Sequence, residues 1–156
     1  MLLRRLLLSL VFLAAAACAT GQAGSPLYRK EIGQASAPDA ITLAEQVIHR
    51  YGYQIDTSEE APEIRILTHW RHRLPFEDER LVGVTAAETR ILVVARQRGN
   101  TNSGTYYNIH FTMENRLGMA GDPTWNEVLN TPMFRAYADE IANDYKLLVS
   151  NIGVRR

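Results

Sequence analysis

Helical spacing of hydrophobic residues first appears around residue 40. The apolar positions follow an i, i+4, i+7, i+8, i+11 pattern, formed by Ala40, Ala44, Val47, Ile48 and Tyr51. Pro38 and Asp39 suit the first turn of a helix, and Gly52 suits the left-handed residue that often follows the last turn. The pattern therefore predicts a helix over Asp39–Tyr51.

Alternating apolar and polar positions then predict strands. This alternation occurs in a short segment at 53–56 and in three longer ones at 63–73, 88–98 and 105–115. The residues that share an apolar face are Ile91, Val93 and Ala95 in the third segment and Tyr107, Ile109, Phe111 and Met113 in the fourth. Residues rich in turn formers at 59–62 and 98–104 predict a turn and a hairpin connection.

The segment 63–73 has the clearest alternation in the chain. Its apolar side carries Ile64, Ile66, Thr68 and Trp70. Its other side carries Arg65, Leu67, His69, Arg71 and Arg73. The segment therefore predicts one strand with an apolar and a basic face. Trp70 is expected in the core, because its position matches those of Ile64 and Ile66.

Two proline steps precede the last hydrophobic stripe. Asp122-Pro123 predicts a short helical turn around Trp125, and Thr131-Pro132 predicts the start of a longer helix. The stripe of that helix is formed by Phe134, Tyr137, Ala138, Ile141, Tyr145 and Leu148. The order helix, about four antiparallel strands, helix predicts an α+β fold, in which an N-terminal and a C-terminal helix flank the antiparallel sheet.

The first seventeen residues have the three parts of a secretory signal. Arg4 and Arg5 precede an apolar run from Leu6 to Ala17, and small residues end it. The run is too short to cross a hydrocarbon core of about 30 Å, which needs roughly 20 residues. We therefore predict a signal peptide over 1–17.

The sole cysteine follows that run, and Ala15-Ala16-Ala17-Cys18 resembles a bacterial lipobox, although the lipobox consensus prefers Leu at the place of Ala15. The resemblance implies cleavage before Cys18, a diacylglycerol on its sulfur and usually a third acyl chain on its amine, which together anchor a protein stably. A simple signal cut after Ala17, leaving a free thiol, is the alternative. A single cysteine has no partner for an internal disulfide.

Ala19 follows the cysteine, where an Asp resembles the signal for retention on the inner membrane of Gram-negative bacteria. The resemblance implies an outer-membrane lipoprotein that faces the periplasm; a Gram-positive surface lipoprotein is the alternative. Residues 18–38 are rich in Ala, Gly, Ser, Gln and Pro, which predicts a lipidated N-terminus with a flexible tether. Residues 39–156 then form a single domain.

The charge balance argues against nucleic acid as a partner. Of 17 Lys and Arg residues, Arg4 and Arg5 lie in the signal, so that fifteen remain against 17 Asp and Glu. The mature chain is nearly neutral and contains no basic run.

The helix, Gly52-Tyr53, the short strand, the turn and the strand with Ile66-Leu67-Thr68-His69-Trp70 resemble the repeated unit of the C lipoprotein of the barrel-assembly complex. Arg90 and the lipobox agree with this resemblance, which covers about residues 40–149. It implies a helix-grip fold and an accessory role in the envelope. This chain has one such unit where that lipoprotein has two, and it lacks the long N-terminal docking segment.

No catalytic or metal-binding motif stands out. The histidines are His49, His69, His72 and His110, and a strand would point His69 and His72 to opposite faces, so solvated or partner-facing histidines are preferred to a metal pair. A G-x-S-x-G elbow and HExxH are missing from the sequence. Glu77, Asp78 and Glu79 predict an exposed charged loop. We expect neither an enzyme nor a bound cofactor or metal.

The basic side of the 63–73 segment is the preferred binding site. The candidate residues are Arg65, His69, Arg71 and Arg73, extended by Arg90 and Arg96 from a neighbouring strand. Guanidinium groups can receive a carboxylate-rich protein surface, peptidoglycan acids or lipid phosphates. The alternative is that these arginines pair with Glu63, Glu88 or Glu114 across strands.

The sequence thus predicts a small, non-enzymatic envelope lipoprotein. Its domain is expected to act as an accessory or interaction module that binds another envelope protein during outer-membrane assembly or maintenance. A lipoprotein that binds a lipid or a glycan between sheet and helices is the alternative.

Overall fold

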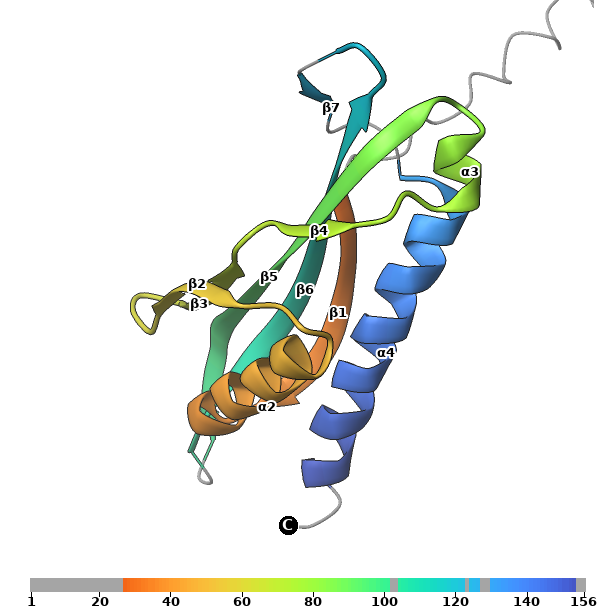
Figure 1. The fold of residues 1–156 in the computed structure, drawn as a ribbon. Helices are drawn as coiled ribbons and strands as arrows, with labels where there is room; N and C mark the ends of the chain where they lie inside the picture. The colour runs from red at the N-terminus through yellow and green to blue at the C-terminus, as the bar shows by residue number, and fades with distance from the viewer. Residues whose placement is uncertain (1–26, 102–103, 123, 127–129, 154–156) are drawn as a thin grey trace, which may run out of the picture.

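The computed structural model describes residues 27–101, 104–122, 124–126 and 130–153 (Figure 1). The predicted signal peptide, Cys18 and the first part of the predicted tether lie outside these residues. The elements in chain order are β1 (Leu27–Ala35), α2 (Ala37–Arg50), β2 (Ile55–Glu59), β3 (Ile64–Thr68), β4 (Arg71–Arg73), α3 (Glu77–Arg80), β5 (Val84–Thr101), β6 (Gly104–Met119), β7 (Trp125–Asn126) and α4 (Pro132–Gly153). None of the described helices has the length and hydropathy that crossing a membrane requires.

The described strands form one seven-stranded antiparallel sheet. The order across it is β1-β6-β5-β3-β2, while β4 pairs with β5 and β7 with β6. The helices α2 and α4 pack against one face of this sheet, which we call the inner face (Figure 1). The predicted α+β class, with an antiparallel sheet flanked by helices, is confirmed. The sheet has more strands than the predicted four.

The two long helices follow from the stripes in the sequence. Helix α2 buries Ala40, Ala44, Val47 and Ile48 as predicted, and Gly52 has the expected positive φ of 71° just past its end. Helix α4 buries Phe134, Ala138, Ile141 and Tyr145. The Tyr145 hydroxyl donates a hydrogen bond of 3.0 Å to the carbonyl of Ala40, which ties the helices to each other. Burial of these stripes against Ile91, Val93, Ile109, Phe111 and Met113 makes the core.

The prediction of a flexible tether as far as Pro38 is wrong for its second half, because Leu27–Ala35 forms β1 at the edge of the sheet. Ile32 and Ala35 are buried. The strand is rich in polar residues, and its register against β6 shifts between Glu31 and Gly33, so its alternation is interrupted. Hydrogen bonds to the edge of β6 hold this segment as a strand. The sequence of the segment itself contains no information about that edge.

Trp125 and Asn126 form the short strand β7, where the sequence predicted a helical turn. Trp125 pairs with Gly118 of β6, and its indole lies beside this glycine. Asp122 accepts a hydrogen bond of 2.8 Å from the backbone N–H of Thr124, so its carboxylate closes a local turn. Residues that cap helices, such as Asp, also favour turns, so the Asp122-Pro123 step is compatible with either structure.

The predicted single strand 63–73 is also wrong, because the structure divides it into β3 and β4. Leu67 pairs with Leu92, and Arg71 pairs with Thr89, so four steps along this segment match three steps along β5. One extra residue therefore lies between the two strands. An extra residue of this kind reverses which face the following side chains occupy.

Candidate functional site

The division between β3 and β4 splits the predicted basic row between the two faces of the sheet. Arg65 lies opposite Val94, on the face away from the helices, which we call the outer face. Arg71 and Arg73 instead lie opposite Thr89 and Ala87, whose side chains are buried at the inner face. The prediction that these arginines form one row is therefore wrong.

On the inner face, Arg73 forms a buried ion pair with Glu79. Its two guanidinium nitrogens donate to the two carboxylate oxygens at 2.5 and 2.7 Å, and Nη2 also donates to Oδ1 of Asn115 at 2.8 Å. The side chain of Glu79 is fully buried, and it accepts a further bond from the backbone N–H of Phe76. The prediction of an exposed acidic loop is therefore wrong for Glu79, since α3 turns this residue inward to meet Arg73.

Arg71 also has its partners within the domain. Its guanidinium lies 5.1 Å from the centre of the Tyr53 ring and donates to the Tyr137 hydroxyl at 3.3 Å. The Tyr53 hydroxyl is 2.7 Å from Oγ1 of Thr89, and burial raises the pKa of this tyrosine. Arg71 therefore connects β4 to α4 and to the residues after α2, while its side chain remains partly open to solvent.

At one end of the outer face, aromatic rings and arginines alternate. Trp70 lies between Arg90 and Arg116, whose guanidinium carbons are 4.4 and 4.2 Å from its ring centre. Arg116 also lies 4.8 Å from the ring centre of Trp125. The prediction that Trp70 belongs to the core is wrong, because the extra residue before β4 places its half-buried ring under cations. We call Trp70, Arg90, Arg116 and Trp125 the arginine–tryptophan stack.

Carboxylates neutralise this stack. Glu114 pairs with Arg90 at 2.6 Å, and Glu88 pairs with Arg116 and, at 2.8 Å, with Nε2 of His72. Arg96, further along the face, pairs with Glu63 at 2.7 Å. For Arg90 and Arg96, the alternative of cross-strand ion pairs is therefore confirmed. Their charges are largely compensated within the domain.

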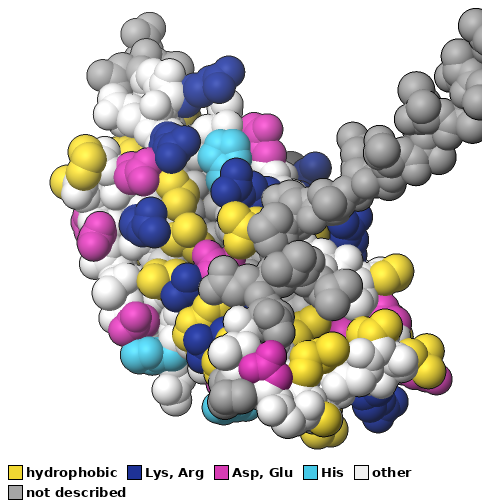
Figure 2. Space-filling view, turned by 90° about the horizontal axis from the view of Figure 1, so that it is seen from above, with side chains coloured by type: hydrophobic (Ala, Val, Ile, Leu, Met, Phe, Trp, Pro, Cys, Tyr) yellow, Lys and Arg dark blue, Asp and Glu magenta, His cyan; other side chains and the backbone are white. Residues whose placement is uncertain are grey.

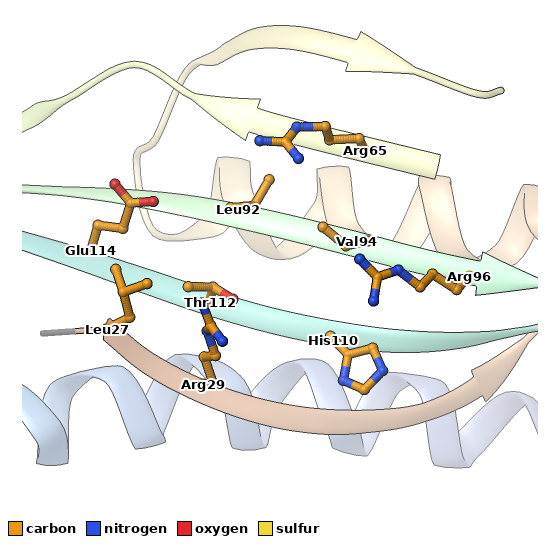
Figure 3. A pocket seen from close by; sticks show the side chains of 9 residues that line it. All are labelled: Leu27, Arg29, Arg65, Leu92, Val94, Arg96, His110, Thr112 and Glu114. Atoms are coloured by element: carbon orange, nitrogen blue, oxygen red, sulfur yellow. The ribbon is translucent and has the colours of Figure 1, made fainter. Parts of the chain in front are cut away.

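Beside the stack, the outer face contains an open pocket with a volume of about 360 Å³ (Figure 3). Its lining comes from β1, β3, β5 and β6, and consists of Leu27, Arg29, Arg65, Leu92, Val94, Arg96, His110, Thr112 and Glu114. Figure 3 shows Leu92 and Val94 between Arg65 above and the polar residues of β6 below, with the helices behind the sheet. The floor is partly apolar and the rim is mainly basic.

Two of the arginines at this pocket have no acidic partner. Within 4.0 Å, neither Arg29 nor Arg65 meets a carboxylate of the residues that the structure describes. Both side chains are exposed. Because Glu114 is already paired with Arg90, the pocket keeps an excess of positive charge. This arrangement can bind a carboxylate or phosphate group through bidentate hydrogen bonds.

The remaining candidate, His69, lies apart from this pocket. Its Nδ1 is 3.6 Å from the carboxylate of Asp56, and both side chains are largely exposed. Among the described residues, no three His, Cys, Asp or Glu side chains are grouped so that they could hold a metal ion.

Sequence reasoning missed Arg29 and Arg116. Arg29 fell in the segment taken as a tether, although the spacing of Tyr28, Lys30 and Ile32 on one side of it is a weak strand signal. Arg116 follows the last residue of the predicted fourth strand, and only the length of β6 adds it to the outer face.

Searches against models of known protein families and against curated proteins gave no match to this chain.

Proposed function

We propose that this protein is a non-enzymatic, lipid-anchored envelope protein whose outer sheet face binds an acidic segment of another envelope protein. Its role would be that of an accessory in outer-membrane assembly or maintenance. The observation that carries the proposal is the unpaired state of Arg29 and Arg65 at the rim of the open pocket.

The charges of the outer face support an acidic partner. The arginine–tryptophan stack and Arg96 have carboxylates of their own, so further anions gain little there. Arg29 and Arg65 stand on either side of β5 and β6, so two acidic groups of one extended segment can reach them. Such charge pairs make binding specific and association fast. Added salt screens the charges and so weakens the interaction.

The floor of the pocket supports a protein segment as the occupant. Leu92 and Val94 are half-buried apolar side chains between the two arginines. An acidic segment with one apolar residue between its acids would cover them, which removes apolar surface from water. Arginine, which lines this pocket three times, is also enriched at interface centres.

The arrangement of the elements supports the helix-grip fold that the resemblance implied. Helix α4 runs along the inner face, α2 crosses it, and the sheet curves around them (Figure 1). We propose that the chain has this fold and that Cys18 carries the lipid anchor. Lipid or glycan binding is the second candidate. Its site would be the pocket of the outer face and not the space between sheet and helices, and the volume of about 360 Å³, within the range of small-ligand pockets, favours it.

Photo-crosslinking from the pocket floor tests the proposal. The full chain would carry p-benzoyl-phenylalanine in place of Val94 and be irradiated in the bacterial envelope, and the products would be identified by mass spectrometry. We expect a crosslink to one protein through an acidic segment. Changing Arg29→Glu and Arg65→Glu should reduce its yield at least tenfold, which corresponds to about 1.4 kcal/mol.

The matched control is Arg135→Glu, an exposed arginine on α4, which should leave the yield unchanged. A crosslink to lipid or glycan would favour the second candidate. A protein crosslink that survives charge reversal at Arg29 and Arg65 would contradict the proposed role of these residues.

A further inference from the structure

Exposed hydrophobic side chains gather at one end of the domain. Among the described residues, the large hydrophobic side chains that are more than a third exposed are Leu74, Leu81, Val82, Trp125, Met133 and Leu147. All but Leu147 lie at the end where α3 and β7 are found (Figure 1). Leu74 and Leu81 are 87% and 81% exposed, values far above those of the core. We call Leu74, Leu81, Val82 and Met133 the apolar tip.

The residues of the apolar tip are held close together by the fold. Leu74 precedes α3, and Leu81 and Val82 follow it. The backbone N–H of Met133, at the start of α4, donates a hydrogen bond of 2.9 Å to the Asp78 carboxylate of α3. Figure 2 looks onto this end and shows hydrophobic side chains grouped to one side of it. Grouped exposed apolar side chains mark an interaction surface, whereas isolated ones do not.

The place where the tether enters the domain relates this tip to the anchor. Cys18 precedes Leu27 by nine residues, which can span at most about 30 Å. Leu27 pairs with Glu114, and β6 continues from there for five residues to Met119, beside Val84 at the tip end. At about 3.4 Å per residue, the tip end lies about 17 Å beyond Leu27. The tether can therefore reach past the tip.

The opposite end of the domain lies farther from the point where the tether enters. The hairpin of β5 and β6 begins again at Gly104, ten residues before Glu114, which corresponds to about 34 Å along β6 from the level of Leu27. This is about twice the distance to the tip end and about the full reach of nine extended residues. The anchor therefore favours the tip end, which the tether reaches with length to spare, over the hairpin end, which would need a fully extended tether.

We infer that the apolar tip lies in the surface of the lipid bilayer that holds the anchor, so that the domain stands with α3 toward the membrane and the β5–β6 hairpin away from it. The inference rests on the lipid anchor of the proposed function, and not on the pocket. Insertion of Leu74, Leu81, Val82 and Met133 among lipid head groups removes their apolar surface from water. The outer face then stands upright, open to a partner from the side.

Depth-dependent quenching in reconstituted vesicles tests this orientation. The lipidated full chain would carry Leu81→Cys, and the new thiol would be labelled with an environment-sensitive fluorophore, since lipidation blocks the sulfur of Cys18. The vesicles would consist of phosphatidylethanolamine and phosphatidylglycerol, with or without nitroxide-labelled lipid. We expect loss of fluorescence with the nitroxide lipid and a blue shift of emission at position 81.

Leu147→Cys supplies the matched control. Leu147 is an exposed leucine of the same type, fourteen residues along α4 from Met133 and so about 21 Å from the tip. Its label should be neither quenched nor shifted. Equal quenching at both positions, or quenching at 147 alone, would overturn the orientation.

The mass of the purified mature chain separates this inference from its premise. An unmodified Cys18 would refute the anchor, and the orientation with it. An acylated Cys18 with an unquenched label at position 81 would refute the orientation alone. Loss of the pocket crosslink would bear on the proposed partner and on neither of these.

Discussion

Two arginines that are eight residues apart show how differently the two faces of this sheet treat charge. On the inner face, Arg73 is only 9% exposed and is held by both oxygens of the fully buried Glu79. On the outer face, Arg65 is exposed at the rim of an open pocket and has no carboxylate within 4.0 Å among the described residues. The first arginine serves the fold, and the second is free to serve binding.

The difference comes from burial and not from residue type. A charge that leaves water must be matched, because an uncompensated buried ion costs several kcal/mol. A charge that stays in water needs no partner, because solvent already stabilises it. An exposed arginine that remains unpaired beside apolar side chains can therefore bind an anionic group without giving up a partner within the fold. The substitutions below test this contrast, in order from the largest expected effect on stability to the smallest.

Removing Glu79 should give the largest effect. Glu79→Ala leaves Arg73 buried without its carboxylate, and we expect a loss of about 3–5 kcal/mol in the free energy of unfolding. Urea unfolding followed by circular dichroism measures this loss. Glu77→Ala, on the same short helix but exposed, is the control and should cost less than about 0.5 kcal/mol. Equal costs would mean that burial does not distinguish these carboxylates.

Trp70 lies between the two extremes. Trp70→Ala removes the ring beneath Arg90 and Arg116, and we expect a loss of about 1–2 kcal/mol in the free energy of unfolding. Trp70→Phe keeps an aromatic face and should recover much of this loss. A cost of about 3–5 kcal/mol, typical of a large core residue, would instead support the core position that the sequence predicted.

The contact between β1 and α4 should depend on pH. Hydrogen bonds from Lys30 Nζ and the Tyr28 hydroxyl, each 2.5 Å long, hold the pKa of Asp139 below its usual value of 3.8. A carboxyl with a lowered pKa stabilises the fold above its usual pKa, and this stabilisation is lost as the pH falls through the lowered value.

Asp139→Asn should therefore destabilise the protein at neutral pH and not in strong acid. We expect a cost of about 0.2–1 kcal/mol near pH 7, because the side chain is 48% exposed. The cost should shrink below about pH 4. Urea unfolding of both proteins across this range measures it, and a cost that grows as the pH falls would contradict the assigned cause.

Arg65 should matter least for stability. Arg65→Ala is expected to change the free energy of unfolding by less than about 0.5 kcal/mol, because the side chain is exposed and unpaired. Urea unfolding of this variant and of Arg73→Ala measures the contrast, and Arg73→Ala should cost several kcal/mol. A large destabilisation by Arg65→Ala would show that this residue supports the fold, and the proposed binding role would lose its main argument.

Much of the fold could be predicted because its signals are local. The stripe of Ala40, Ala44, Val47 and Ile48 sets the buried side of α2 through spacing alone. The alternation of Ile109, Phe111 and Met113 sets the buried side of β6 in the same way. Strand β1 escaped prediction because its pairing partner, β6, lies about eighty residues away in the chain.

The candidate site could be predicted only in part, for a related reason. The sequence predicted a binding site made of arginines. Three of the predicted residues, Arg65, Arg90 and Arg96, lie on the outer face of the sheet. The prediction also placed Arg71 and Arg73 in the same row. It assumed that side chains alternate between the two faces without a break, whereas the extra residue near Trp70 interrupts this alternation. Nothing in that local pattern marks the extra residue, which is visible only in the pairing with β5.

The sequence by itself determined which segments of this protein are helix and strand along most of its length, since hydrophobic periodicity acts within a segment. It also supplied the N-terminal pattern from which the lipid anchor is proposed. Only the tertiary structure decided which arginines are matched and which remain free, and that the apolar tip stands at the end nearest the tether. Those outcomes depend on register and on contacts between distant segments, which spacing along a single chain does not encode.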